Sequence, residues 1–274
     1  MTEIHDSTGG APEQIARLAE IMRRLRDPET GCAWDVAQDF ASIAPYTIEE
    51  AYEVADAIER QAWDELPGEL GDLLLQAVFH AQMASEAGMF DLADVARSVA
   101  DKMVARHPHV FGDEDGNRTP GEQVQAWEAI KAAERAGRAE GGTLDGVALG
   151  LPALLRAAKL QKRAARVGFD WPETTQVLDK LREEAAELVE ARETLSQAEV
   201  EEEMGDLLFT MANLARHLGI DPEAALRGAN AKFTRRFAAI EAGLARSGRR
   251  PEESDLQEMD ALWNEARAAD KRAG

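Results

Sequence analysis

The chain has 274 residues, of which 45% are hydrophobic and 30% charged, enough for one large or two modest domains with apolar cores. Its formal net charge of −21 weighs against unaided binding to nucleic acid or to an anionic membrane, although a bound divalent metal would still permit an anionic ligand. Cys32 is the single cysteine, so no intrachain disulfide can form, and the lack of a signal-peptide pattern predicts a cytoplasmic protein.

Helix-forming residues dominate the chain, and capping residues, glycine and proline mark where the helices of the first half begin and end. Ala, Leu, Glu and Arg are abundant whereas runs of β-branched residues are scarce, so we expect an all-α fold. Thr47 and Glu50 fit a capping box, which predicts a helix over 47–60. Two longer helices should follow, one ending near Gly88 and one before Pro108, and then a short helix.

A Gly-rich, weakly patterned stretch at 136–150 predicts a linker between a domain of residues 1–135 and a domain of residues 151–274. Beyond it the helices resume, and Ser196 with Glu199 fits a second capping box. Four of the helices predicted in this half span 152–166, 174–194, 196–219 and about 255–269. A further helix, before the last of these, should begin at Asp221 and Pro222.

Sequence blocks of the first half return in the second in the same order. The two acidic blocks recur at an offset of 134 residues (50 to 184, 69 to 203), and a basic block recurs at an offset of 130 (102 to 232). Such ordered recurrence predicts a tandem duplication of one helical-bundle domain. The pairs are EEAYE (49–53) with EEAAE (183–187), GELGDLL (68–74) with EEMGDLL (202–208), and DKMVAR (101–106) with AKFTRR (231–236).

The acidic blocks place carboxylates at helical spacing. Glu184 and Glu187 share one helix face, as do Glu203 and Asp206 on the next helix, and a short connection would make the two helices antiparallel. The four carboxylates would then form one cluster, which a hard divalent cation such as Mg²⁺ would neutralise. The equivalent residues of the first half are Glu50, Glu53, Glu69 and Asp72.

Two other interpretations of these acids were considered. Acid-rich helix faces are usually solvated surface, but their recurrence beside apolar residues favours a metal site, and we expect Leu207, Leu208 and Phe209 to anchor the second helix in the core. A di-iron carboxylate bundle requires Glu-x-x-His, and none of the five histidines has Glu three residues before it.

Basic residues point to an anionic ligand. Lys232 and Arg236 lie four residues apart on one helix face, and Lys102 and Arg106 repeat the pair in the first half. Facing a metal–carboxylate cluster, such pairs favour a polyphosphate over ordinary surface salt bridges. Trp263 would stack on a base or anchor a core.

The duplicated pattern EExxE, fifteen residues, then ExxD, followed by a KFxRRF block, resembles the MazG nucleoside triphosphate pyrophosphohydrolases. The resemblance covers nearly the whole chain and is closest to the two-domain bacterial form. Further blocks that carry it are RLRDPETGCAWD (24–35), APYTIEEAYEV (44–54), RHPHVF (106–111) and VGFDW (167–171).

The resemblance implies an all-α fold of the dimeric dUTPase type, a homodimer, and Mg²⁺-dependent hydrolysis of nucleoside triphosphates, with Mn²⁺ as a substitute metal. The acidic net charge and the lack of a long apolar run predict no stable nucleic-acid binding and no membrane partner. The implied metal ligands are Glu184, Glu187, Glu203 and Asp206, and the implied nucleotide contacts are Lys180, Glu202, Lys232, Arg236 and Trp263.

The second half is predicted to be the main catalytic unit, with Glu183 as the base that activates water. The first half carries Tyr46 where the second has Lys180, so it is a weaker second site or a structural partner. Glu199 stands where family members often carry a lysine, which puts one nucleotide contact in doubt. The alternatives are a narrow enzyme of this fold, acting on dUTP or phosphoribosyl-nucleotides, and a non-catalytic acidic adaptor.

Overall fold

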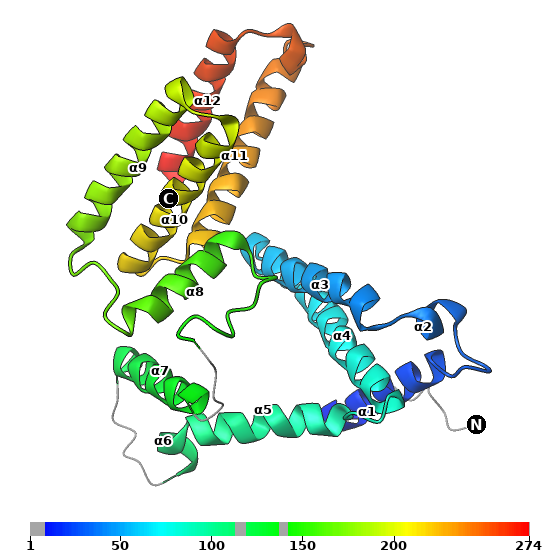
Figure 1. Ribbon diagram of the computed structural model, residues 1–274. Coiled ribbons are helices and arrows are strands. Elements are labelled where there is room, and N and C mark those ends of the chain that lie inside the picture. The colour runs from blue at the N-terminus through cyan, green and yellow to red at the C-terminus, as the bar shows by residue number, and fades with distance from the viewer. Residues whose placement is uncertain (1–8, 113–118, 137–141, 274) are drawn as a thin grey trace. The chain divides into compact units, whose positions relative to one another are not determined.

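The computed structural model describes residues 9–112, 119–136 and 142–273, and every regular element within these ranges is a helix (Figure 1). The chain divides into two compact units, residues 1–132 and 133–274. The predicted all-α fold with tandem domains is therefore confirmed. The predicted linker at 136–150 lies partly outside the described residues. Within the described ranges, none of the helices has the length and apolar character that a membrane span needs.

The first unit is built on the hairpin of α3 (Phe40–Arg60) and α4 (Leu66–Glu86), which lie side by side in Figure 1. Helix α1 (Ala11–Leu25) packs against α4, and α5 (Leu92–Arg106) follows from the end of α4. The other helices here are α2 (Ala33–Ala37), α6 (Pro108–Phe111) and α7 (Pro120–Ala136), which continues past the end of the unit.

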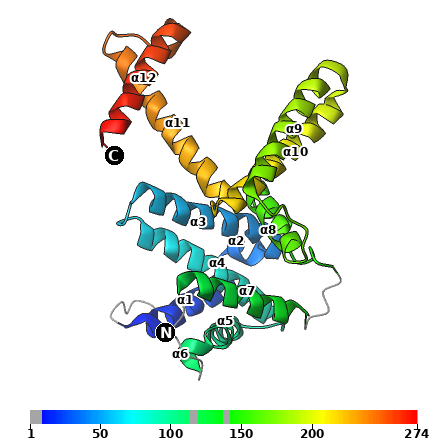
Figure 2. The ribbon, with the colours of Figure 1, turned by 90° about the vertical axis from the view of Figure 1, so that its left-hand side faces the viewer.

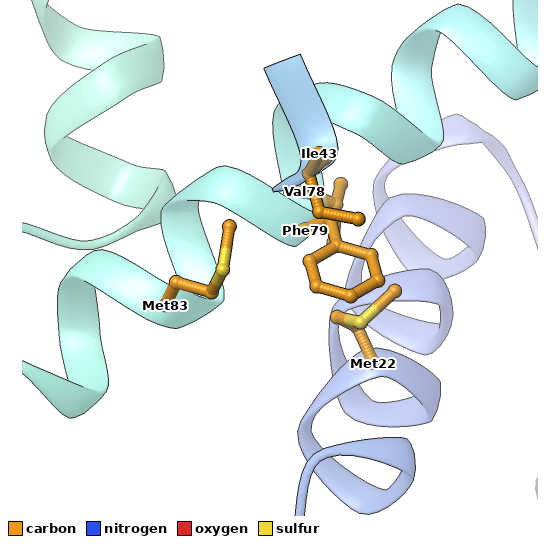
Figure 3. Close-up of a cluster of buried hydrophobic side chains, with 5 residues drawn as sticks. All are labelled: Met22, Ile43, Val78, Phe79 and Met83. Atoms are coloured by element: carbon orange, nitrogen blue, oxygen red, sulfur yellow. The ribbon is translucent and has the colours of Figure 1, made fainter. Parts of the chain in front are cut away.

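Three helices of the first unit contribute to one apolar core. Figure 3 shows Phe79 of α4 directed toward Met22 of α1, and Ile43 comes from α3. Because these side chains are almost fully buried, truncating one of them to Ala should cost about 2–5 kcal/mol. The core consists of Met22, Ile43, Val78, Phe79 and Met83.

Arg26 ties the start of the first unit together. Its guanidinium donates to the Glu86 carboxylate at 2.8 Å and to the backbone carbonyls of Asp35 and Gln38. It also lies 5.4 Å from the centre of the Phe79 ring. One largely buried cation therefore fixes the α2 segment to the end of α4.

Helix α3 begins at Phe40, so the predicted start at Thr47 is wrong. The capping box is made by Asp39, whose carboxylate accepts from the Ser42 amide at 2.8 Å while the Ser42 hydroxyl accepts from the Asp39 amide. Pro45 is tolerated because it lies near the helix start and removes only one backbone bond. The Thr47 hydroxyl instead lies inside the helix, 3.1 Å from the His80 ring nitrogen Nε2.

The second unit contains two helical hairpins. Helices α9 (Thr174–Thr194) and α10 (Gln197–His217) pack along each other, and α11 (Pro222–Ala245) packs against α12 (Leu256–Ala273). Helix α8 (Ala153–Ala165) contacts α10 and α11, and a short 3₁₀ turn, η1 (Pro251–Glu253), precedes α12. Figure 2 shows the two hairpins extending in different directions from the region of α8.

Helix boundaries in the second unit follow their capping residues. The predicted box at the start of α10 is present, since the Ser196 side chain accepts from the Glu199 amide and the Glu199 carboxylate accepts from the Ser196 amide. Asp221 caps α11 in the predicted position. The expected core role is wrong for Leu208 and Phe209, which remain 46% and 44% exposed, whereas Leu207 is half-buried. Within the second unit, the described helices leave that part of the α10 surface exposed.

Candidate active site

Helix α9 places two carboxylates and a lysine on one face. Lys180, Glu184 and Glu187 are spaced by four and three residues, which brings them onto adjacent turns. Glu184 is only 5% exposed, which is rare for a carboxylate unless it is paired or binds a metal. The buried position of Glu184 separates this face from an ordinary solvated acidic surface.

Helix α10 supplies the third carboxylate of the group. Leu195 and Ser196 alone separate α9 from α10, so the helices run antiparallel and Glu203 comes opposite Glu184 and Glu187. Carboxylate oxygens of these three residues all lie within 4.8 Å of one another. Burial, followed by the charges of Glu187 and Glu184, raises the pKa of Glu203. Three converging oxygens with strong mutual repulsion fit a hard divalent cation.

Lys180 neutralises part of this group. Its Nζ lies 2.8 Å from Glu183 Oε1, 2.8 Å from Glu184 Oε1 and 3.9 Å from Glu187 Oε2. Hydrogen bonds to Glu183 and then to Glu184 raise the pKa of Lys180. The lysine therefore remains charged beside the carboxylates and is available to an incoming anion at the same place.

Three other predicted residues lie outside the three-carboxylate group. Asp206 is exposed and adds its negative charge to the field that raises the pKa of Glu203, as Glu202 does. Glu183 is exposed on α9 and paired with Lys180.

The first unit holds a related group with a different membership. Carboxylate oxygens of Glu50, Glu69 and Asp72 lie within 4.8 Å of one another, while Glu53 is exposed outside the group. Burial, and then a hydrogen bond with Glu53, raises the pKa of Glu50. Tyr46, in the place of Lys180, is 42% exposed.

Two of the predicted phosphate-binding residues, Lys232 and Arg236, lie on the other hairpin of the second unit. Arg236 of α11 donates to the Asp270 carboxylate of α12 at 2.8 Å, and its guanidinium carbon lies 5.4 Å from the centre of the Trp263 ring. Lys232 is exposed one turn earlier. Asp270 was not among the predicted residues, because its contact with Arg236 joins two helices across a sequence separation of 34 residues.

The corresponding residues of the first unit lie on α5 and α7. Lys102 is exposed, and the Arg106 backbone carbonyl accepts a hydrogen bond from the Trp127 indole nitrogen at 3.0 Å. Trp127 also meets the His107 ring edge-on, with centroids 5.0 Å apart. This tryptophan therefore anchors α7 to the end of α5.

Comparison with protein families matches residues 38–111 and 173–239 to the MazG nucleotide pyrophosphohydrolase domain. The chain is 52% identical over 256 residues to nucleoside triphosphate pyrophosphohydrolases of Escherichia coli K12 and O157:H7, covering 93% of this chain and 97% of each relative. It is 44% identical to the nucleoside triphosphate pyrophosphohydrolase/pyrophosphatase MazG of Thermotoga maritima, covering 93% of this chain and 96% of that protein. Each acidic group lies within one of the two matched segments.

Proposed function

The chain belongs to the family of MazG nucleotide pyrophosphohydrolases, and we propose that its second half hydrolyses nucleoside triphosphates to the monophosphate and pyrophosphate. The observation that carries this proposal is the group formed by buried Glu184 with Glu187 and Glu203, in contact with Lys180. We further propose that these carboxylates, with Asp206, hold Mg²⁺, for which Mn²⁺ can substitute.

A bound Mg²⁺ would neutralise the carboxylates and polarise the phosphates. Lys180 would exchange its carboxylate partners for phosphate oxygens, since both are anions within reach of one ammonium group. Lys232 and Arg236 would bind the remaining phosphates, Trp263 would lie against the base, and Glu202 would contact the nucleotide. These cations would offset the charge that builds on the leaving pyrophosphate.

In the reaction, the oxygen of a water molecule would bond to the α-phosphorus while the bridging bond to the β-phosphate breaks. Glu183 would take the proton from that water, because it lies beside the carboxylate group without belonging to it. Release of Lys180 toward the phosphates would free the Glu183 carboxylate for this role.

We propose that the active protein is a homodimer. Exposed apolar residues on α10 and α11 support this, since Met211 is 50% and Phe233 58% exposed. Figure 2 shows the α11–α12 hairpin extending away from α9 and α10, so a second copy could bring nucleotide-binding residues to the carboxylate group.

We retain the domain limits 1–135 and 151–274 as part of the proposal. The first domain would hold a weaker second site, formed by Glu50, Glu53, Glu69 and Asp72 with Lys102 and Arg106.

Product analysis tests the function. The full-length chain is incubated with each common ribo- and deoxyribonucleoside triphosphate, with and without Mg²⁺, and the products are identified by ³¹P NMR. We expect monophosphate and pyrophosphate to form only when metal is present. Diphosphate and phosphate would contradict the assigned bond, and no turnover of any nucleotide would contradict general hydrolysis.

A further inference from the structure

A pocket of about 300 Å³ lies between α11 and α12. Its lining is apolar apart from one residue, Asp260 of α12. The walls include aromatic rings, since the centroids of Phe233 and Trp263 lie 5.5 Å apart and those of Phe233 and Phe237 lie 6.1 Å apart. Aromatic walls with an open, partly exposed rim suit a flat ligand that keeps one edge in solvent.

Cations beside the pocket indicate what else that ligand carries. Arg236 lies over the Trp263 ring, and Lys232 directly precedes Phe233 on α11. A flat ring system attached to a polyphosphate satisfies both the aromatic walls and these charges. Under the proposed function, on which this inference rests, the occupant is the base of the nucleoside triphosphate.

Asp260 is the one polar residue in the lining of this otherwise apolar pocket. One carboxylate oxygen, Oδ2, accepts from the Asn264 amide nitrogen at 3.0 Å, and within the described residues no partner is recorded for Oδ1. An ionised carboxylate can only accept hydrogen bonds. A base with an exocyclic amino group satisfies it, whereas a carbonyl oxygen at the same edge repels it.

We propose that Asp260 is a specificity-determining residue that favours nucleobases bearing an exocyclic amino group over those with only carbonyl groups at that edge. Adenine and cytosine, which carry their amino groups at equivalent positions, are therefore preferred over hypoxanthine and uracil. Because Asp260 is exposed and its hydrogen bond competes with water, the preference should be about tenfold and not several hundredfold. Asp260 touches the base and not the phosphates, so the preference should appear in KM.

The test compares two matched substrate pairs, ATP with ITP and CTP with UTP, in each of which an amino group is replaced by a carbonyl oxygen at the same ring position. With the full-length chain and Mg²⁺, kcat and KM are measured for wild type, Asp260→Asn, and the control Glu265→Gln, which neutralises an exposed acid of α12 outside the pocket. We expect kcat/KM to favour ATP over ITP and CTP over UTP about tenfold in wild type and in the control, and each preference to fall to about twofold or less in Asp260→Asn. Circular dichroism verifies that each variant is folded.

Binding is measured in parallel through Trp263 fluorescence with the same four nucleotides. Loss of all hydrolysis with an Asp260-dependent binding preference would contradict the proposed function and leave this inference standing. Equal kcat/KM values for ATP and ITP in wild type, or a preference unchanged in Asp260→Asn, would overturn the inference while hydrolysis continues. Absence of binding to all four nucleotides would overturn both.

Discussion

The two acidic groups differ most at one position, Lys180 in the second unit and Tyr46 in the first. Around Lys180, Glu184 and Glu187 converge with Glu203, and the lysine contacts both α9 carboxylates. The first group, with Tyr46 at the equivalent position, joins Glu50 to Glu69 and Asp72, and burial, followed by the neighbouring Glu53, raises the pKa of Glu50. The second group therefore has a lysine among its carboxylates, whereas the first has an uncharged tyrosine at the equivalent position.

The pockets beside the basic residues also differ between the two units. In the second unit a pocket is lined by both α11 and α12, and Trp263 is one of its walls. In the first unit the pocket beside Lys102 is lined only by residues 90–102, and Trp127 is bonded to the Arg106 carbonyl instead. Among the described residues, the pocket beside Lys232 and Arg236 therefore has walls from two helices, whereas the pocket beside Lys102 is lined by residues of α5 and of the segment directly before it.

The largest expected effect comes from neutralising one carboxylate in each unit and comparing the two variants. Glu184→Gln should lower kcat by about a thousandfold or more, because it removes a buried ligand of the metal. Glu50→Gln should leave steady-state hydrolysis close to wild type. The assay is pyrophosphate release with saturating Mg²⁺, and a loss in Glu50→Gln equal to that in Glu184→Gln would contradict the asymmetry.

A second pair of variants tests the lysine that distinguishes the groups. Lys180→Met should lower kcat/KM by about a hundredfold, because it removes a cation aimed at charge developing on the leaving group. Tyr46→Phe, at the equivalent position, is the control and should have no effect. If kcat/KM of Lys180→Met falls no more than that of Tyr46→Phe, the phosphates do not bind at Lys180.

The two tryptophans should respond differently to truncation. Trp263→Ala should raise KM about tenfold through loss of base stacking, with little change in kcat. Trp127→Ala should lower the melting temperature of the protein without changing KM, because its indole holds α7 on α5. Steady-state kinetics and thermal melts on both variants measure the difference, and the reverse pattern would exchange the two roles.

A smaller effect should follow from adding a methyl group between α11 and α12, next to the pocket. A Cβ at Gly243 would lie 2.8 Å from the Leu262 side chain, beside Trp263. Gly243→Ala should displace α12 slightly and raise KM a few-fold, while the helix itself gains propensity. Gly228→Ala, where no atom lies near the added Cβ, is the matched control.

Sequence patterns predicted the helices whose ends have a capping side chain or a terminating glycine. Asp221, the Ser196–Glu199 box and Gly88, with its φ of 67°, lie where the structure has helix ends. Helix α1 was not predicted, because Gly10 precedes it without a side-chain cap, and α2 is too short for a periodic signal. The start of α3 was misplaced because Thr47 and Glu50 satisfy the capping pattern inside a helix that Asp39 already caps.

The candidate site was predictable where it depends on spacing within a helix. The spacing of Glu184 and Glu187 and the short α9–α10 connection are enough to bring Glu203 beside them. Spacing does not fix side-chain rotamers, so it could not predict that Asp206 and Glu53 lie outside the three-residue groups. Nor could it predict Asp260 in the pocket or Asp270 on Arg236, which depend on the packing of α12 against α11.

The most direct measurement is a crystal structure of the full-length chain with Mg²⁺ and an α,β-methylene nucleoside triphosphate, which cannot be cleaved at the α–β bridge. We predict metal on Glu184, Glu187 and Glu203, and the Lys180 ammonium moved from the carboxylates to the phosphates. Metal and nucleotide bound only at Glu50, Glu69 and Asp72 would contradict the assignment of catalysis to the second half.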